Sequence, residues 1–201
     1  MKVIKFRRDK EMGEVIINRT DQITDKNQAI EEAKRLYSNV LGSYPTNFNG
    51  DYYTDLDKIV EQLAIVAASK DFSRLFKGLN TNKKYIDASG LLINKDGKFY
   101  IYSNSNENAD RQRFTIAHEI GHYKLNHIPE IEGKNFIMRD QVSSSGTDKK
   151  EVCANAFAAE LLMPEQIVKE LVKMGYSERA MALGLRVSIS AIRNRLDSLK
   201  L

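Results

Sequence analysis

Histidine, cysteine and proline are scarce in this sequence, and tryptophan is missing from it. The chain has 3 histidines, 1 cysteine and 3 prolines among 201 residues. A single cysteine, Cys153, excludes internal disulfide bonds and fits a reducing compartment. No apolar run approaches the roughly 18 residues of a membrane span, and the charged start MKVIKFRRDKEMGE lacks the apolar core of a signal peptide. We therefore expect a cytoplasmic protein that does not associate with a membrane.

A concentration of charge of one sign is also lacking. The 31 lysines and arginines are interleaved with 27 aspartates and glutamates, for a net charge of +4. No basic tract of the kind that marks a nucleic-acid-binding arm is present, so we expect no direct contact with nucleic acid. With 42% hydrophobic and 29% charged residues, the composition is that of a globular protein long enough for one good core.

The patterns along the chain predict an α+β fold. Amphipathic spacing predicts helices over 27–40 and 55–68. The β-rich runs 90–95 and 98–103 flank Asp96-Gly97, which is typical of a hairpin with a two-residue turn. The remaining expected elements are short strands at 2–6 and 14–18, helices over 109–126, 149–162, 164–174 and 177–200 (broken near Gly184), and an irregular loop over 128–148. The stretch LGSYPTNFNGD (41–51) collects turn-forming residues and predicts a boundary, with an N-terminal α/β extension of unknown role over 1–50 and the main domain over 51–201.

All three histidines lie within ten residues of one another, in and just after RFTIAHEIGHY (113–123). His118 and His122 are four apart, so on a helix both rings project from one face and could bind one metal ion. Glu119 lies at the edge of that face, where it could act as a general base without being a ligand. The alternative is a buried helix with incidental polar residues, but burying two histidines and a carboxylate is costly unless they are paired.

A catalytic zinc site needs a third protein ligand, and three residues are candidates. On a continuing helix His127 would lie about 140° away from the metal face, which predicts a surface or loop histidine instead of a ligand. Glu151 and Asn155, in EVCANAFAAELLMP (151–164), are four apart on a predicted helix. Glu151 could bind the metal while Asn155 orients a ligating histidine. Glu160 lies on the opposite side of that helix, so both glutamates cannot face one metal ion.

These two motifs, RxRFTxAHExGH and ExxANxFAAxLLMP, together resemble the ImmA/IrrE family of metallopeptidases over about residues 52–201. The resemblance implies a zincin-like metallopeptidase domain with a small β-hairpin or sheet, a central HExxH helix and C-terminal helices over about 164–201. It also implies His118, His122 and Glu151 as zinc ligands and Glu119 as the catalytic base. The implied substrate is a helix-turn-helix transcriptional repressor, cut at one site in mobile-element or stress regulation.

Two readings from other functional classes stay open. The stretch SERAMALGLRVSISAIRNRL (177–196) could be a helix-turn-helix that reads DNA through Arg193 and Arg195, in a regulator whose zinc is structural. The chain could also bind a partner without cutting it. Because 165–201 carries few excess basic side chains, we favour a packing or partner-docking helix pair.

The residue that stabilises the oxyanion of the transition state is not identified by the sequence. Tyr100, Tyr102 and Tyr123 are possible donors. Arg113 could serve as well, although a structural ion pair is the reading we favour for it. The run 98–103 could be an exposed edge strand that holds an extended peptide, or an ordinary hairpin strand.

Overall fold

The computed structural model describes residues 22–44, 52–76, 87–95, 97–127, 136–138 and 148–201, in which helices and strands are mixed as the sequence predicts for an α+β fold. The strands expected at 2–6 and 14–18, and most of the boundary at 41–51, lie outside these residues. Among the described helices, none has the length and apolar character needed to cross a membrane.

The sheet has the strand order β1-β3-β2-β4. Its strands are β1 (Val66–Lys70), β2 (Gly90–Lys95), β3 (Lys98–Asn104) and β4 (Phe136–Met138). β2 and β3 form the expected antiparallel hairpin, and Gly97 has the left-handed φ of 79° that suits its turn. β3 also pairs with β1, in parallel, so it is an interior strand. The hypothesis that 98–103 is a peptide-binding edge is therefore wrong.

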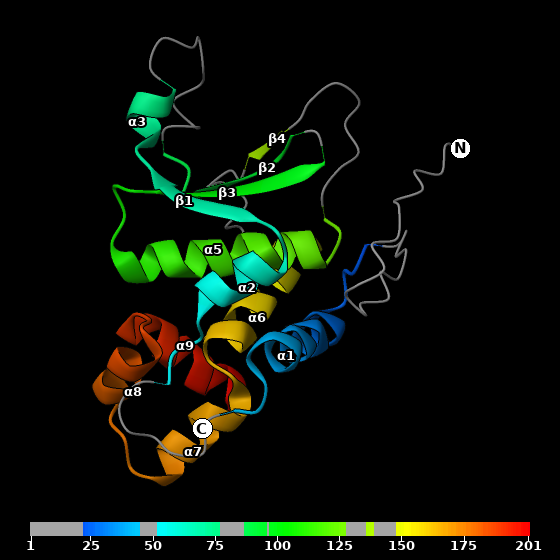
Figure 1. Ribbon diagram of the computed structural model, residues 1–201. Helices are drawn as coiled ribbons and strands as arrows, with labels where there is room; N and C mark the ends of the chain where they lie inside the picture. The colour runs from blue at the N-terminus through cyan, green and yellow to red at the C-terminus, as the bar shows by residue number, and fades with distance from the viewer. Residues whose placement is uncertain (1–21, 45–51, 77–86, 96, 128–135, 139–147) are drawn as a thin grey trace.

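Side chains alternate between the two faces of the sheet. Leu92 and Ile101 belong to the main core, which includes residues of the helix α5 (Ala109–Lys124). Leu91 and Tyr102 point the other way, into a small cluster with α3 (Phe72–Leu75). Figure 1 shows α3 and α5 on opposite sides of the strands. The sheet therefore separates α5 from the small cluster.

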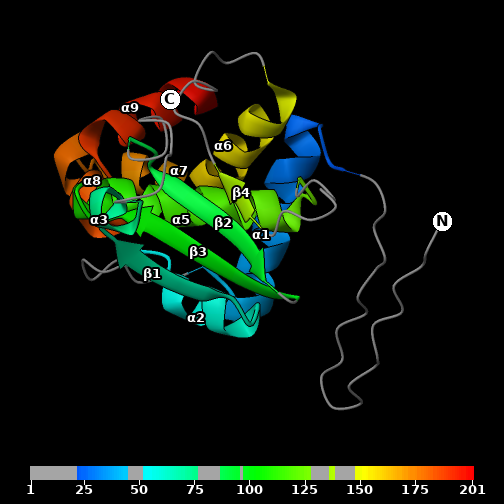
Figure 2. The ribbon, with the colours of Figure 1, turned by 90° about the horizontal axis from the view of Figure 1, so that it is seen from above.

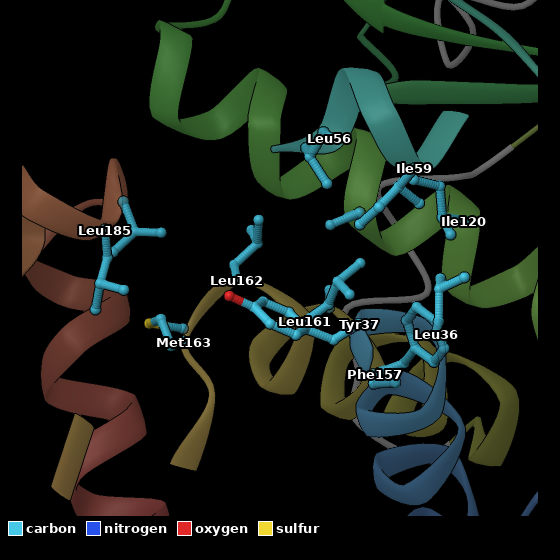
Figure 3. Close-up of a cluster of buried hydrophobic side chains, with 14 of the residues drawn as sticks. Leu36, Tyr37, Leu56, Ile59, Ile120, Phe157, Leu161, Leu162, Met163 and Leu185 are labelled. Carbon is cyan, nitrogen blue, oxygen red and sulfur yellow. The ribbon is translucent and has the colours of Figure 1, made fainter. Parts of the chain in front are cut away.

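The helices α1 (Lys26–Leu41) and α6 (Lys149–Leu162) form a further layer, on the side of α5 away from the sheet. Buried side chains join the layers, with Ile120 from α5, Phe157 from α6 and Leu36 from α1 gathered in one cluster (Figure 3). Figure 2 shows the sheet lying over α5, with α6 and α1 beyond it. α5 is thus enclosed between the sheet and α6.

α1 confirms the helix expected over 27–40, and the Asp25 carboxylate caps it by accepting a hydrogen bond from the Gln28 amide at 2.9 Å. Although it belongs to the 1–50 extension, α1 shares its buried face with the core of the main domain. The division of the chain at residue 50 stays a prediction.

Two predictions about secondary structure are wrong. The helix expected over 55–68 ends early: α2 (Leu56–Gln62) is followed by Ala64 with a left-handed φ of 53°, and the chain then enters β1. The apolar periodicity of the sequence extends past the end of α2, but Ile65 and Val66 are β-branched residues, which favour a strand. Within 128–148, expected to be irregular, β4 forms because β2 offers it a pairing edge.

Three helices close the chain, and all were expected. They are α7 (Glu165–Lys173), α8 (Glu178–Leu185) and α9 (Ile189–Leu199). The break predicted near Gly184 falls at Arg186, which has a left-handed φ of 54°. Gly184 has a packing role instead, since a Cβ there would lie 2.4 Å from the Tyr52 ring.

Candidate metal centre

α5 presents the two histidines of the motif side by side. The Asn108 side chain caps the helix by accepting a hydrogen bond from the Arg111 amide at 2.9 Å, which fixes the residue at which the helix begins. The Nε2 atoms of His118 and His122 are 2.8 Å apart, as expected for residues one turn apart on one face. His118 is fully buried.

α6 brings Glu151 to the same point. Its carboxylate oxygens lie 3.3 Å from His118 Nε2 and 3.1 Å from His122 Nε2. Gly121, between the two histidines, lies at this close approach, since a Cβ there would be 3.3 Å from the Ala154 backbone, tighter than an ordinary contact. Small residues at the crossing let the two helices pack closely enough for a glutamate to reach the imidazoles.

The group of His118, His122 and Glu151 fits a metal ion. One ligand atom from each lies within 4.8 Å of the others. Two atoms bound to a tetrahedral zinc ion at about 2.0–2.1 Å lie about 3.3 Å apart, close to the distances found here. Two nitrogens and one carboxylate oxygen also form the donor set of catalytic zinc sites that keep one position open.

Asn155 lies where it can fix the tautomer of His118. Its Oδ1 atom is 2.8 Å from His118 Nδ1, so the ring donates its Nδ1–H to the amide oxygen. His118 Nε2 is then left with a lone pair directed at the centre. The sequence predicts this orienting role for Asn155, and the contact supports it.

His127 likewise orients His122. It lies after the end of α5, in the loop that was one of its two predicted positions, but the other, a surface position, is wrong. His127 is buried, and its Nε2 lies 2.6 Å from the carbonyl oxygen of Ile23. Burial lowers the pKa of His127 to about 4, against the raising effect of the Ile23 carbonyl, so the ring is neutral at pH 7. Nε2–H donates to Ile23, and Nδ1 accepts from His122 Nδ1–H at 3.1 Å. The second histidine is thereby also left with a lone pair on Nε2.

The electrostatics of the group favour a cation. Burial raises the pKa of the Glu151 carboxyl, but its hydrogen bonds with His118 and His122 and the charge of those rings outweigh this, and the pKa lies well below its ordinary value. Glu151 is therefore a carboxylate. With both Nδ1 atoms donating elsewhere, neutral His118 and His122 rings present two Nε2 lone pairs beside an anionic oxygen, and a metal ion between them would supply the positive charge that protons on the rings otherwise supply.

Glu119 is buried beside this group but is not part of it. Its side chain is 2% exposed and lies against the start of β2, where a Cβ added at Gly90 would be 2.9 Å from Glu119 Oε1. A glycine at that position gives the carboxylate its space. Among the described residues, the three whose ligand atoms converge do not include Glu119.

Glu160 faces away from the centre, as the helical phase predicts. It forms a buried ion pair with Arg195 of α9, and its other oxygen accepts from the Glu165 amide at 3.2 Å. Arg195 also donates from Nε to the carbonyl oxygen of Met163 at 2.9 Å. The two glutamates of α6 thus serve opposite faces, one toward the imidazoles and one toward α9.

Comparison with known proteins places the chain in a family. Residues 77–197, more than half of the chain, match the family described as the IrrE N-terminal-like domain, a group of peptidases. The chain belongs to this family. The three histidines, Glu119, Glu151 and Asn155 lie inside the matched range, whereas Ile23 and α1 lie before it.

Curated relatives agree with the family. The chain is 34% identical over 108 residues to the radiation response metalloprotease IrrE of Deinococcus radiodurans, covering 48% of this chain and 31% of that protein. It is 32% identical over 97 residues to the metallopeptidase ImmA of Bacillus subtilis, covering 47% and 54%. It is 38% identical over 71 residues to an uncharacterised immunity region protein of Bacillus phage phi105, covering 35% and 42%. The chain thus spans about a third to a half of the length of these relatives.

The fold leaves fewer candidates for the residue that stabilises an oxyanion. Tyr102 packs on the face of the sheet opposite α5, and Tyr100, two residues earlier on β3, shares that face. Neither reaches the metal centre from there. The expected ion pair of Arg113 is not among the contacts of the described residues, and its Nη2 donates instead to the carbonyl oxygen of Thr54 at 2.8 Å.

The two arginines of the DNA-reading alternative lie in different environments. Arg193 of α9 pairs with Glu178 of α8 at 2.8 Å, and Arg195 is 6% exposed in its pair with Glu160. Ser188 caps α9 by accepting a hydrogen bond from the Ala191 amide at 3.1 Å. Arg195 is therefore not available for base edges or phosphates, whereas the side chain of Arg193 is 64% exposed in a surface ion pair. The burial of Arg195 is what counts against the DNA-reading alternative.

The role of His127 leads to a testable prediction. We expect His127→Ala to weaken zinc binding about 10- to 100-fold, because His122 loses the acceptor that fixes its ring. His127→Gln, whose amide oxygen can accept the same hydrogen bond, should restore part of the loss. Competition with a chromophoric chelator measures both affinities. Equal affinities for wild type and His127→Ala would show that the contact does not orient His122.

Proposed function

We propose that this chain is a zinc-dependent endopeptidase with a zincin-like arrangement, which makes one site-specific cut in a helix-turn-helix transcriptional repressor. The observation that carries the proposal is the convergence of His118 Nε2, His122 Nε2 and the Glu151 carboxylate within 4.8 Å, with Glu119 next to His118 on α5. The names of two relatives, a metalloprotease and a metallopeptidase, support the reaction class.

In this proposal His118, His122 and Glu151 hold the zinc, and Asn155 and His127 keep the imidazole lone pairs directed at it. Zinc, when bound, polarises the carbonyl of the scissile peptide bond and lowers the pKa of water. Glu119 accepts the proton of the attacking water on its carboxylate and passes it to the nitrogen of the leaving amine. Its burial against Gly90 excludes bulk water from one side of the carboxylate.

The repressor as substrate is the finer part of the proposal. It rests on the family, together with the name of the phage relative, an immunity region protein. Mobile-element or stress regulation is the setting that this substrate suggests.

A cleavage assay on one repressor tests the proposal. The substrate is the helix-turn-helix repressor encoded nearest to this gene, incubated with purified protein that carries about one zinc per chain, as expected for a single three-ligand site. We expect one discrete cut, located by mass spectrometry and abolished by a chelator. Binding of the repressor without any cut would favour the alternative of a partner-binding regulator.

A structural zinc site would weigh against the enzyme in a separate way. Such sites are closed by four protein ligands, whereas the described residues offer three. X-ray absorption on the purified zinc protein counts the ligands. Four protein ligands and no water would contradict the proposed reaction.

A further inference from the structure

The start of β2 lies directly against the side chain of Glu119. Figure 2 shows β2 passing over α5. Gly90 is the first residue of β2, and a Cβ there would lie 2.9 Å from Glu119 Oε1 and 3.5 Å from Glu119 Cγ. Because Glu119 is 2% exposed, its carboxylate meets the backbone of Gly90 on this side and not bulk water.

Thr115 borders the same space. Thr115 and Glu119 are one turn apart on α5, so they share a face of the helix. A Cβ at residue 90 would lie 2.4 Å from Thr115 Cγ2. Thr115 is β-branched and fully buried, so its methyl group has little freedom to move. Gly90 and Thr115 together limit the room that the Glu119 carboxylate has beneath the sheet.

The backbone conformation does not require a glycine at residue 90. Gly42, Gly97 and Gly175 are the glycines with a positive φ among the described residues, and Gly90 is not one of them. A glycine within a strand weakens the strand and often marks a place where another group approaches closely. At Gly90 the approaching groups are the side chains of Thr115 and Glu119.

Ser89 anchors the start of β2 to the start of α5. Its Oγ donates a hydrogen bond to Glu107 Oε1 at 2.7 Å and accepts one from Arg111 Nη2 at 3.3 Å. Its carbonyl oxygen accepts from the Asn104 amide, at the end of β3, at 2.9 Å. Ser89 is 2% exposed, so these bonds are shielded from water. They fix the distance between Gly90 and the helix that carries the proposed base.

The placement of a general base bears directly on its efficiency. A glutamate side chain has three rotatable bonds, so its carboxylate takes many positions unless its surroundings restrict it. A misplacement of about 1 Å in a catalytic arrangement can cost about 10²-fold in rate. A fixed backbone on one side of the Glu119 carboxylate removes part of this freedom before any substrate binds.

We propose that Gly90 is a positioning residue for Glu119. The start of β2, held to α5 through Ser89, confines the carboxylate to the place from which it accepts the proton of the attacking water. The inference rests on the proposed function and adds a residue of the sheet to it. Because Gly90 acts through Glu119, its effect falls on kcat and not on substrate binding or on zinc.

The test adds one methyl group at residue 90. Gly90→Ala alone places that group against both Thr115 and Glu119, so stability and activity fall together. Gly90→Ala combined with Thr115→Ser lacks the Thr115 Cγ2 atom, and the remaining contact under 3 Å is with the flexible end of Glu119. The double variant should therefore regain stability while its carboxylate stays displaced. Thr115→Ser alone is the reference for the double variant.

Leu91→Ala, at the next residue of β2, is the matched control. Leu91 is 1% exposed and belongs to the small cluster on the opposite face of the sheet. Its truncation loosens the same strand without adding anything near Glu119. Cleavage of the repressor gives kcat and KM, elemental analysis gives the zinc content, and thermal unfolding sets an assay temperature at which every variant is folded.

We expect the double variant to have a kcat about 10- to 100-fold below that of Thr115→Ser, with KM and zinc content unchanged. Leu91→Ala should unfold at a lower temperature but keep its kcat. A crystal structure of the double variant should show Glu119 Oε1 displaced from its place beside residue 90, a result that does not depend on activity.

The failures are distinguishable. If wild type cuts the repressor and the double variant has the kcat of Thr115→Ser, the inference is overturned and the proposed function stands. An equal loss of kcat in Leu91→Ala, or an unchanged position of Glu119 Oε1, also overturns the inference. Absence of any cut by wild type overturns the proposed function, and the crystal structure still decides whether residue 90 confines the carboxylate.

Discussion

Glu119→Gln is expected to fold, to keep its zinc, and to cut the repressor about 10²–10⁴-fold more slowly than wild type. The reason is chemical, because an amide of the same shape cannot accept the proton of the attacking water. The substitution adds no volume against Gly90, and Glu119 is outside the group whose ligand atoms converge. Initial cleavage rates and elemental analysis on the same preparations measure the two properties.

The zinc content is the internal control for this prediction. A loss of activity that came with a loss of zinc would make Glu119 a ligand or a structural residue instead of a base. Equal cleavage by wild type and Glu119→Gln would point to a contaminating protease or to another mechanism.

Two substitutions nine positions apart on α6, Glu151→Gln and Glu160→Gln, are expected to affect different properties, the first zinc binding and the second stability. Glu151→Gln removes an anionic ligand, so zinc should be lost during dialysis against a chelator that leaves wild type loaded. Glu160→Gln should keep its zinc but lose about 3–5 kcal/mol in the free energy of unfolding, because it leaves Arg195 as a buried charge without its anion.

The pair serves as its own control, since the same chemical change is made twice on one helix. Zinc content is measured by elemental analysis, and stability by urea unfolding of the zinc-free proteins, so that bound metal does not contribute. Loss of zinc from Glu160→Gln with retention by Glu151→Gln would reverse the assignment of the two carboxylates.

Much of the candidate site could be predicted because it depends on helical periodicity. His118 and His122 are on one face by spacing alone, and Glu151 and Glu160 are on opposite faces for the same reason. The role of Gly121 could not be predicted from spacing, because it depends on a close approach to the Ala154 backbone on another helix.

His127 shows where the periodicity argument ends. The 140° offset assumed that the helix continues through residue 127, but α5 ends at Lys124 and Asn126 has a left-handed φ of 56°. This turn lets the His127 amide donate to the His122 carbonyl at 2.9 Å and brings the His127 ring within hydrogen-bonding distance of the His122 ring. An asparagine after the last apolar position of a helix is a recognised stop signal, so the sequence did contain a clue.

The contact between Ile23 and His127 has a consequence for the order in which the molecule assembles. The two residues are 104 positions apart, and the Ile23 amide also bonds the Leu125 carbonyl at 3.0 Å, so both links close one very long loop. Contacts of such sequence separation form slowly, because the entropy of loop closure is lost before they stabilise anything. Local helices can therefore appear while His122 still lacks its fixed tautomer. We expect tight zinc uptake during refolding to lag behind helix formation, and the metal to report when the start of the chain has docked.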